Sequence, residues 1–314
     1  MPTQANQPLP SGYRLEGYRI ANVLSCGGFS IVYLAHDQND QPVAIKEYLP
    51  AQLALRKKGA ELPSIADEDR PTFRYGLQCF FEEGRSLALL SHTNVVRVLN
   101  FFRANETAYL VMRYEHGRTL QQHIRDCLGA LKEDFLRSMF VQLLNGLREV
   151  HAHKLLHLDI KPANIYIRTD NVPILIDFGA ARQTLRAEGL MLSPMCTPGF
   201  APAEQYRCTS LGPWSDIYSV GATLFTCLAG AAPQPANQRV RMDRYVSATR
   251  LWRGKYSREF LETIDWCLEM EPLRRPQSVF ALQKVLMGAR KPEIRKTHDL
   301  LTRMRGRMLK AVNL

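Results

Sequence analysis

The chain has 314 residues, of which 46% are hydrophobic and 23% charged, the balance of an ordinary globular protein. Its net charge of +11 is no evidence for a nucleic-acid partner by itself, because no nucleic-acid-reading motif accompanies it. The seven cysteines are scattered without a Cys-x-x-Cys pair, which argues against a zinc site or a disulfide framework and for reduced thiols in the cytoplasm.

The two ends of the chain differ from its middle. Residues 1–12 are polar and contain prolines, so we expect no signal peptide, and we predict a flexible segment over residues 1–16. The most apolar stretch, residues 217–232, is too short to span a membrane and is predicted to be a buried helix. The last residues, 288–314, are in contrast rich in Lys and Arg.

The first half of the domain reads as strands around one helix. Residues 24–33 hold two adjacent glycines between serines, and residues 43–46 end a β-prone run on a lysine. Residues 47–75 form a long connector that is predicted to be a polar surface loop. Residues 80–90 have helical apolar spacing and end before a β-prone segment at residues 91–98.

The second half of the domain contains two motifs with candidate catalytic residues. Residues 109–117 read as a strand followed by a glycine-containing turn. Residues 157–164 are His-Leu-Asp-Ile-Lys-Pro-Ala-Asn, and residues 177–179 are Asp-Phe-Gly. These two motifs supply a proton acceptor for a hydroxyl, a lysine for migrating negative charge, and an amide and a carboxylate that can hold Mg²⁺. They therefore indicate phosphoryl transfer.

Together the motifs resemble the catalytic loop and the metal-binding motif of protein kinases, whose pattern is H-R-D-x-x-x-x-N followed by D-F-G. Leu158 stands where the family usually has arginine. The resemblance covers about residues 17–287 and implies an α+β, bilobal fold. A small, mainly antiparallel β lobe of five strands and one main helix is expected over about residues 17–114, and a larger helical lobe over about residues 115–287.

By resemblance, ATP binds between the lobes with Mg²⁺, or with Mn²⁺ as an alternative ion. Lys46 holds the phosphates and pairs with an acidic residue of the helix; counting back from the next segment favours Glu83 over Glu82. Ser25 and Ser30 replace two of the family's loop glycines, which implies a stiffer loop. The residues expected to contact ATP are Leu24, Ser25, Cys26, Gly27, Gly28, Phe29, Ser30, Val32, Ala44, Lys46, Met112 as gatekeeper, and the backbone of Arg113 and Glu115.

The family's roles also extend to the catalytic loop and to the large lobe. The resemblance implies that Asp159 accepts the substrate proton and that Lys161 neutralises the transferring group. Thr197 is expected to hydrogen-bond near both and to belong to the substrate platform. The remaining expected roles are metal binding for Asn164 and Asp177, and structural support for His157 and Phe178, for Asp216 under the catalytic loop, and for a buried ion pair between Glu204 and Arg275.

Three functions fit these motifs. Lys161 and Thr197 favour a serine/threonine protein kinase over a tyrosine kinase, and the long connector after Lys46 resembles that of a subset of bacterial kinases, which indicates a role in bacterial signalling. A pseudokinase scaffold is the alternative, because two loop glycines are lost. A small-molecule kinase is disfavoured by Thr197 and by the Pro-Ala-Glu at residues 202–204.

Regulation and partners follow less directly. Leu158 cannot pair with a phosphate, so activity is predicted not to require phosphorylation at Thr184 or Ser193. Protein substrates and a cognate phosphatase are the expected partners, and no nucleic acid is expected. Residues 288–314 contain eight Lys or Arg against two acidic residues and can form an amphipathic helix. Docking of this tail on the large lobe, or a linker role, is favoured over contact with an anionic membrane surface.

Overall fold

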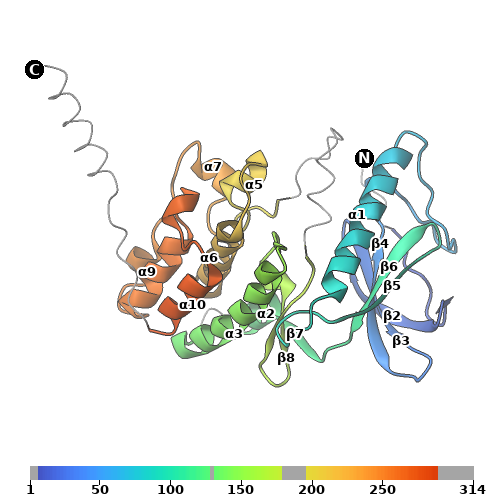
Figure 1. The fold of residues 1–314 in the computed structure, drawn as a ribbon, viewed down its shortest axis with the longest axis horizontal. Coiled ribbons are helices and arrows are strands. Elements are labelled where there is room, and N and C mark those ends of the chain that lie inside the picture. Colours follow the sequence, from blue (N-terminus) through green and yellow to red (C-terminus); the bar gives the residue numbers. More distant parts are fainter. Residues whose placement is uncertain (1–5, 128–130, 179–195, 289–314) are drawn as a thin grey trace, which may run out of the picture.

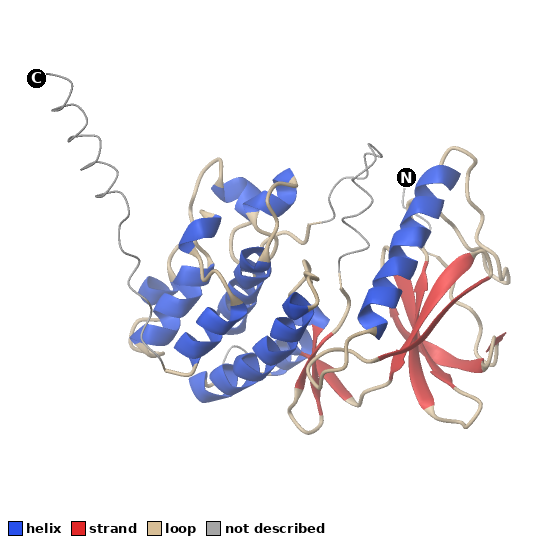
Figure 2. Cartoon of the chain, in the orientation of Figure 1, coloured by secondary structure: helices blue, strands red, loops and turns tan. Residues whose placement is uncertain are grey.

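The computed structural model describes residues 6–127, 131–178 and 196–288, which form two lobes (Figure 1). The small lobe is a six-stranded antiparallel sheet with α1 packed against it, and the large lobe is mostly helical (Figure 2). This confirms the predicted bilobal α+β fold. The small-lobe strands are β1 (Arg14–Leu15), β2 (Tyr18–Cys26), β3 (Ser30–His36), β4 (Pro42–Tyr48), β5 (Val98–Ala104) and β6 (Thr107–Arg113), in the order β1-β2-β3-β4-β6-β5.

The β-strands follow from alternation and turn chemistry. In β3, Ile31, Tyr33 and Ala35 are buried while the residues between them are less so, which is the period of a strand with one face on the core. The turn into β4 is closed by Asp37, whose Oδ1 accepts hydrogen bonds from the backbone N–H groups of Asn39 and Gln41. The sheet has six strands and not the predicted five, because two residues of the N-terminal segment add β1.

The N-terminal segment packs against the small lobe from residue 6 onward. Leu9 is only 2% exposed. The side-chain amide of Asn6 donates to the carbonyl oxygens of Leu49 and Ala54, at 3.2 and 3.1 Å. The prediction of a flexible segment over residues 1–16 is therefore wrong for residues 6–16, and residues 1–5 lie outside the described ranges. Polar composition failed as a guide because these side chains bond to the connector.

Helix α1 (Arg70–Ala88) is longer than the sequence pattern indicated. Pro71 lies in its first turn, where its missing N–H costs nothing, and Phe73, Phe80 and Leu87 lie on its buried face toward β5 and β6. The helix therefore takes over the last part of the predicted connector. The prediction of a polar surface loop is also wrong within residues 48–56, because Arg56 is 0% exposed.

The large lobe begins with a small sheet and continues in helices. Helix α6 is buried along nearly all of its length, as predicted for the apolar stretch that begins at Ile217. A Cβ on Gly221 would lie 2.4 Å from Cβ of Cys267, so α6 and α9 pack at a distance that only glycine allows. The elements are β7 (Gly117–Thr119), β8 (Ile165–Arg168) and β9 (Pro173–Leu175), helices α2 (Leu120–Asp126), α3 (Glu133–Ala152), α5 (Ala203–Arg207), α6 (Pro213–Ala229), α7 (Ala236–Arg239), α8 (Ala248–Leu251), α9 (Arg258–Cys267) and α10 (Val279–Leu286), and 3₁₀ turns η1 (Pro162–Asn164) and η2 (Pro272–Arg274).

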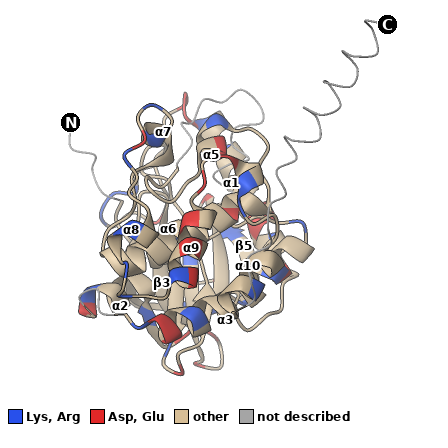
Figure 3. Ribbon diagram, turned by 90° about the vertical axis from the view of Figure 1, so that its left-hand side faces the viewer, with Lys and Arg blue, Asp and Glu red and all other residues tan. Residues whose placement is uncertain are grey.

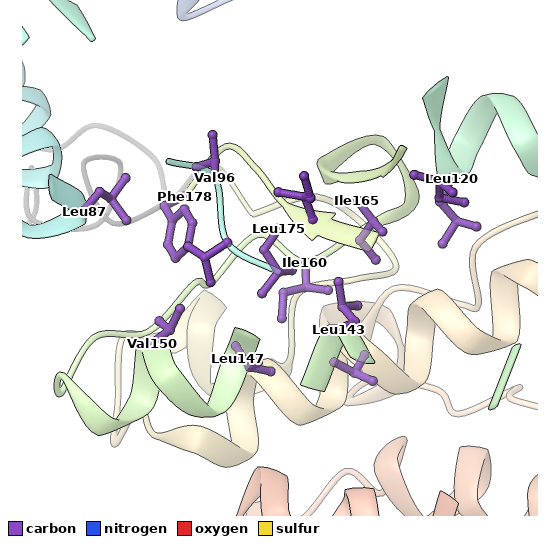
Figure 4. Packing of buried hydrophobic residues seen from close by; sticks show 14 of the residues in the cluster. Leu87, Val96, Leu120, Leu143, Leu147, Val150, Ile160, Ile165, Leu175 and Phe178 are labelled. Atoms are coloured by element: carbon purple, nitrogen blue, oxygen red, sulfur yellow. The ribbon is translucent and has the colours of Figure 1, made fainter. Parts of the chain in front are cut away.

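A continuous apolar core runs between the lobes. Figure 4 shows Leu87 of α1 on one side of Phe178 and Leu175 of β9 on the other, with Val150 and Leu147 of α3 below them. Surface charge is mixed: Figure 3 shows basic and acidic positions interspersed over the helices of the large lobe. No helix among the described residues is long and apolar enough to cross a membrane. The basic tail from residue 289 onward lies outside the described ranges.

Candidate active site

The catalytic loop brings five predicted residues to one point. Thr197 Oγ1 donates to Asp159 Oδ1 at 2.7 Å, and Lys161 Nζ lies 2.9 Å from both Asp159 Oδ2 and Thr197 Oγ1. The amide of Asn164 donates to the carboxylate and to the backbone oxygen of Asp159, both at 2.9 Å. The backbone N–H of Asp159 donates to Nδ1 of His157 at 3.3 Å. The carboxylate of Asp159 is thus fixed from several sides, and the predicted contacts of Thr197 are present.

Asp216 holds the loop from below, as predicted. Its two carboxylate oxygens accept the backbone N–H groups of His157 and Leu158 at 2.9 and 2.7 Å, and Nε2 of His151 lies 2.8 Å away. Burial alone would raise the pKa of Asp216, but the hydrogen bond and charge of His151 and the loop N–H groups outweigh burial and lower it. Asp216 therefore stays ionised and keeps accepting these bonds.

Leu158 itself is in a left-handed conformation, with φ of 62°. Such a conformation costs a non-glycine residue roughly 1–3 kcal/mol and persists only where its surroundings impose it. Here its N–H bonds to Asp216, its carbonyl accepts from Nε2 of Gln205 at 2.8 Å, and its side chain is buried. The strain is stored directly before Asp159. Thr184 and Ser193 belong to residues 179–204, which correspond by resemblance to the activation segment of protein kinases, and both lie outside the described ranges.

His157 is fully buried. Burial lowers its pKa, which outweighs the nearby carboxylates of Asp216, Asp159 and Asp177. Its Nε2 lies 3.2 Å from the carbonyl oxygen of Ile176 and its Nδ1 faces the N–H of Asp159, so the tautomer with the proton on Nε2 satisfies both contacts. The ring stacks on Phe178 with centroids 4.3 Å apart. His157 thereby joins the catalytic loop to the Asp-Phe-Gly segment.

The lysine of β4 reaches the same centre. Lys46 Nζ lies 2.5 Å from Asp177 Oδ1. Glu83 is buried on α1 and lines a cavity of about 380 Å³ together with Leu87 and Phe178. Its pairing with Lys46 stays a prediction.

The oxygen donors fit a magnesium ion. The described residues contain no cluster of three or more His, Cys, Asp or Glu that could hold a metal alone. Mg²⁺ does not need one, because it is usually bound through one or two carboxylates together with substrate phosphates. Asp177 offers a carboxylate, and Asn164 directs its Nδ2 to Asp159 and so has its amide oxygen left as a ligand. These two residues suit the ion that the sequence implied.

Residues 24–33, which are expected to hold the nucleotide and are called the nucleotide loop below, contain the turn between β2 and β3. The turn is closed by a 2.9 Å bond from the Gly27 N–H to the Ser30 carbonyl. A Cβ on Gly28 would meet nothing within 4 Å, so the space above it is open for a ligand. Leu24 at the end of β2 is 42% exposed, although leucine is usually buried. An exposed leucine beside an open turn is a suitable surface for a nucleotide.

The other residues expected around ATP lie on neighbouring strands. The cross-strand partners Val32 and Lys46 join β3 to β4, and Ala44 and Met112 join β4 to β6. Ser25 and Cys26 end β2, and Arg113 ends β6, with Glu115 two residues beyond it. The sheet therefore gathers the predicted nucleotide contacts along its strands.

The predicted ion pair in the large lobe is present. Arg275 donates to both carboxylate oxygens of Glu204, at 2.7 and 3.2 Å, and both residues are buried. Ser215 adds a 3.0 Å hydrogen bond to the same carboxylate. The pair joins Glu204 of α5, just beyond Thr197, to the residue that follows η2, and so fastens the described end of the activation segment to the lobe.

Sequence reasoning missed three supporting residues. His151 bonds to Asp216 beneath the catalytic loop, and Gln205 donates to the backbone carbonyl of that loop. Arg56 forms a buried ion pair with Glu47 in the small lobe. The last two turns of α3 contain Arg148 and Glu149, so His151 did not differ from its polar neighbours in the sequence. Nothing in the local pattern distinguished Arg56 from the surface charges that follow it.

Comparisons with known proteins agree with this geometry. The protein kinase domain model matches residues 18–287. Serine/threonine-protein kinase B of Synechocystis is 29% identical over 92% of this chain and 49% of its own length, and the kinase PknA of Nostoc is 31% identical over 69% and 38%. The chain thus spans about half or less of the length of these relatives.

Solved structures lead to the same family. The apo form of PpkA-294 has a TM-score of 0.81 and 36% identity, and the match covers 89% of this chain and 99% of that one. The kinase domain of Mycobacterium tuberculosis PknI, at 21% identity and a TM-score of 0.67, supports the fold alone. With its catalytic loop, its Asp-Phe-Gly motif and the match over residues 18–287, the chain belongs to the protein kinase family.

Proposed function

We propose that this chain is a serine/threonine protein kinase that transfers the γ-phosphate of ATP to protein hydroxyls in bacterial signalling. One observation carries the proposal: the hydroxyl of Thr197 donates to Asp159 while Lys161 lies 2.9 Å from both. A carboxylate that already accepts a hydroxyl hydrogen bond beside a cation has the chemistry to accept a substrate hydroxyl. Lys161 and Thr197 in this arrangement also support serine and threonine as acceptors.

In the proposed mechanism each group acts on charge. Asp159 orients the incoming hydroxyl and takes its proton, and Lys161 stabilises the negative charge of the transferring phosphoryl group. Lys46, held by Glu83, positions the ATP phosphates. Mg²⁺ supplies neutralisation of those phosphates when bound, and Asn164 and Asp177 would hold it.

The partners follow from this reaction. Protein substrates and a cognate phosphatase are proposed, acting in the cytoplasm, and contact of the basic tail with a membrane surface is the less favoured alternative. The cyanobacterial kinases similar to this chain support the bacterial setting. Leu158 is buried and apolar, which supports activity that does not depend on a phosphate in the activation segment.

The test is phosphate transfer from labelled ATP with Mg²⁺, with the purified chain alone and with a generic basic protein. Asp159→Asn should lower turnover by about 10²–10⁴ because the proton acceptor is lost. Asp170→Asn is the matched control, since the half-exposed Asp170 contacts Arg168 and the backbone N–H of Val172 and none of the catalytic-loop residues. Near-normal turnover of Asp159→Asn would remove Asp159 from its role. Nucleotide binding without transfer in the parent would favour a pseudokinase scaffold, and labelling of aminoglycosides or choline but not of protein would favour a small-molecule kinase.

A further inference from the structure

The nucleotide loop is bonded to the connector that follows β4. Beyond the last pair of the β3–β4 ladder, the Leu49 N–H donates to the carbonyl of Phe29 at 2.9 Å, and the Ala51 N–H donates to the carbonyl of Gly28 at 2.8 Å. The connector therefore extends the sheet to the tip of the loop. The loop's backbone is held on the side away from β2 by two N–H groups.

The connector is in turn anchored by a buried guanidinium. Arg56 donates to both oxygens of Glu47 at 2.6 and 2.7 Å, and both side chains are 0% exposed. Glu47 also accepts the hydroxyls of Tyr33 and Tyr109 at 2.7 and 2.8 Å. Arg56 itself donates to the Tyr33 hydroxyl at 2.9 Å and to the Gln7 carbonyl at 2.7 Å. Each partner of this ion pair is thus held by further hydrogen bonds, as buried charges require.

Asn6 closes the arrangement. Its side chain accepts the backbone N–H of Arg56 at 2.7 Å and donates to the carbonyls of Leu49 and Ala54. The turn between these residues is held by bonds from the N–H groups of Leu53 and Ala54 to the Pro50 carbonyl. Residues 49–56 are therefore locked at both ends.

We propose that Arg56 is a positioning residue for the nucleotide. With Glu47 it holds residues 49–51, so that the N–H groups of Leu49 and Ala51 fix the nucleotide loop at Phe29 and Gly28. The inference rests on the proposed function, since it assigns the loop to ATP. A loop that is ordered before the ligand arrives does not lose that conformational freedom on binding, so its affinity is higher. Such an effect acts equally on bound substrate and transition state and therefore changes KM more than kcat.

Ala51→Pro tests the contact without touching the ion pair. The bonds to the Pro50 carbonyl make residue 51 the first position of a helical turn, where proline is tolerated. The substitution removes the N–H that donates to Gly28 and turns the ring Cδ toward the same carbonyl, so this contact is lost. Lys58→Pro is the matched control: residue 58 is the second residue of a turn closed by Ala60 N–H on the Lys57 carbonyl, with Gly59 at φ of 80°, a position that proline favours.

Calorimetric affinity for a non-hydrolysable MgATP analogue is the first readout, and KM for ATP against kcat is the second. Ala51→Pro should lower the affinity for the analogue and raise KM for ATP, each by about 3- to 10-fold, the effect of one hydrogen bond. The value of kcat should stay within about twofold of the parent. Lys58→Pro should match the parent. Parental affinity in a folded Ala51→Pro protein would overturn the role of the connector.

Arg56→Lys tests the anchor. It keeps the buried positive charge but loses the planar fork that grips both oxygens of Glu47, so affinity should fall in the same direction as in Ala51→Pro. If Ala51→Pro weakens binding and Arg56→Lys does not, Arg56 is not the positioning residue. A parent that binds the analogue without transferring phosphate would refute the proposed function alone, because the binding comparison would still decide the positioning role.

Discussion

Among the described residues each lobe contains one buried arginine–glutamate pair, and the two pairs are built around opposite charges. In the large lobe Arg275 is the centre: besides Glu204 it donates to the carbonyls of Glu269, Met270 and Trp214. In the small lobe the carboxylate of Glu47 is the centre and accepts from Arg56 and two tyrosine hydroxyls.

This difference shows how a buried charge can be satisfied from different directions. A guanidinium has five donors and suits a site where several backbone carbonyls converge, as they do between the end of α9 and the start of α6. A carboxylate accepts only, and suits a sheet interior where hydroxyls project from neighbouring strands. In each lobe, removing the central residue leaves more unpaired groups than removing its partner.

The largest expected effect is on the stability of four methionine variants: the arginine variant should be the less stable of the two in the large lobe, and the glutamate variant in the small lobe. Arg275→Met should destabilise by about 3–5 kcal/mol and by more than Glu204→Met, because it strands a buried carboxylate and three carbonyls. Glu47→Met should likewise cost about 3–5 kcal/mol and more than Arg56→Met, which leaves Glu47 with two hydroxyl donors.

Unfolding in urea measures these four variants. All three tryptophans, Trp214, Trp252 and Trp266, lie in the large lobe, so their fluorescence reports that lobe, while calorimetry reports both. The double variant Glu47→Met/Arg56→Met is the control and should recover most of the loss, since it strands no charge. If the arginine variant were the less stable one in both lobes, or the glutamate variant in both, the two pairs would not be centred on opposite charges.

A smaller effect is expected at the hydroxyls around Glu47. Burial raises the pKa of Tyr33 and Tyr109, and each keeps its proton to donate to the carboxylate. Tyr109→Phe should cost about 1–2 kcal/mol in the parent and more in an Arg56→Met background, where each remaining donor matters more. Tyr206→Phe is the control, because the described residues give its buried hydroxyl no partner. Equal costs for Tyr109→Phe and Tyr206→Phe would argue against a carboxylate-centred network.

The smallest effect concerns His157, a buried group for which the described residues provide no ion pair. Burial lowers the pKa of His157 below its ordinary value of 6.5, so the unfolded chain takes up a proton there before the folded one does. Stability should therefore fall as pH drops below about 6.5, with a slope from this residue of at most about 1.4 kcal/mol per pH unit.

His157→Gln should make this dependence shallower between pH 7 and 5. Burial also lowers the pKa of His123, but that contribution is common to both proteins and cancels in their difference. The carboxylates with lowered pKa, such as Asp216, lose their contribution only at lower pH, where the unfolded chain protonates them. Parallel stability profiles for parent and variant would show that His157 does not titrate in this range.

The sequence by itself determined the catalytic loop. Asp159, Lys161 and Asn164 lie within six consecutive residues, and Asp177 lies two residues beyond the end of β9. Short motifs therefore specify both the groups and their spacing. The resemblance to protein kinases also identified Asp216 and the pair between Glu204 and Arg275. Each of these residues lies in a short sequence motif that resembles the corresponding motif of the family, so it could be identified without the structure.

Only the tertiary structure decided what holds the small lobe. Arg56 lies in a run of basic residues that reads as a surface loop, and residues 6–16 read as a polar end. Both became structural because their bonds join segments distant in the chain: Asn6 to the turn at residues 49–54, and Arg56 to Gln7. Whether a polar side chain faces water or a buried partner depends on which segments the fold brings together, and the local pattern of polar and apolar residues does not contain that information.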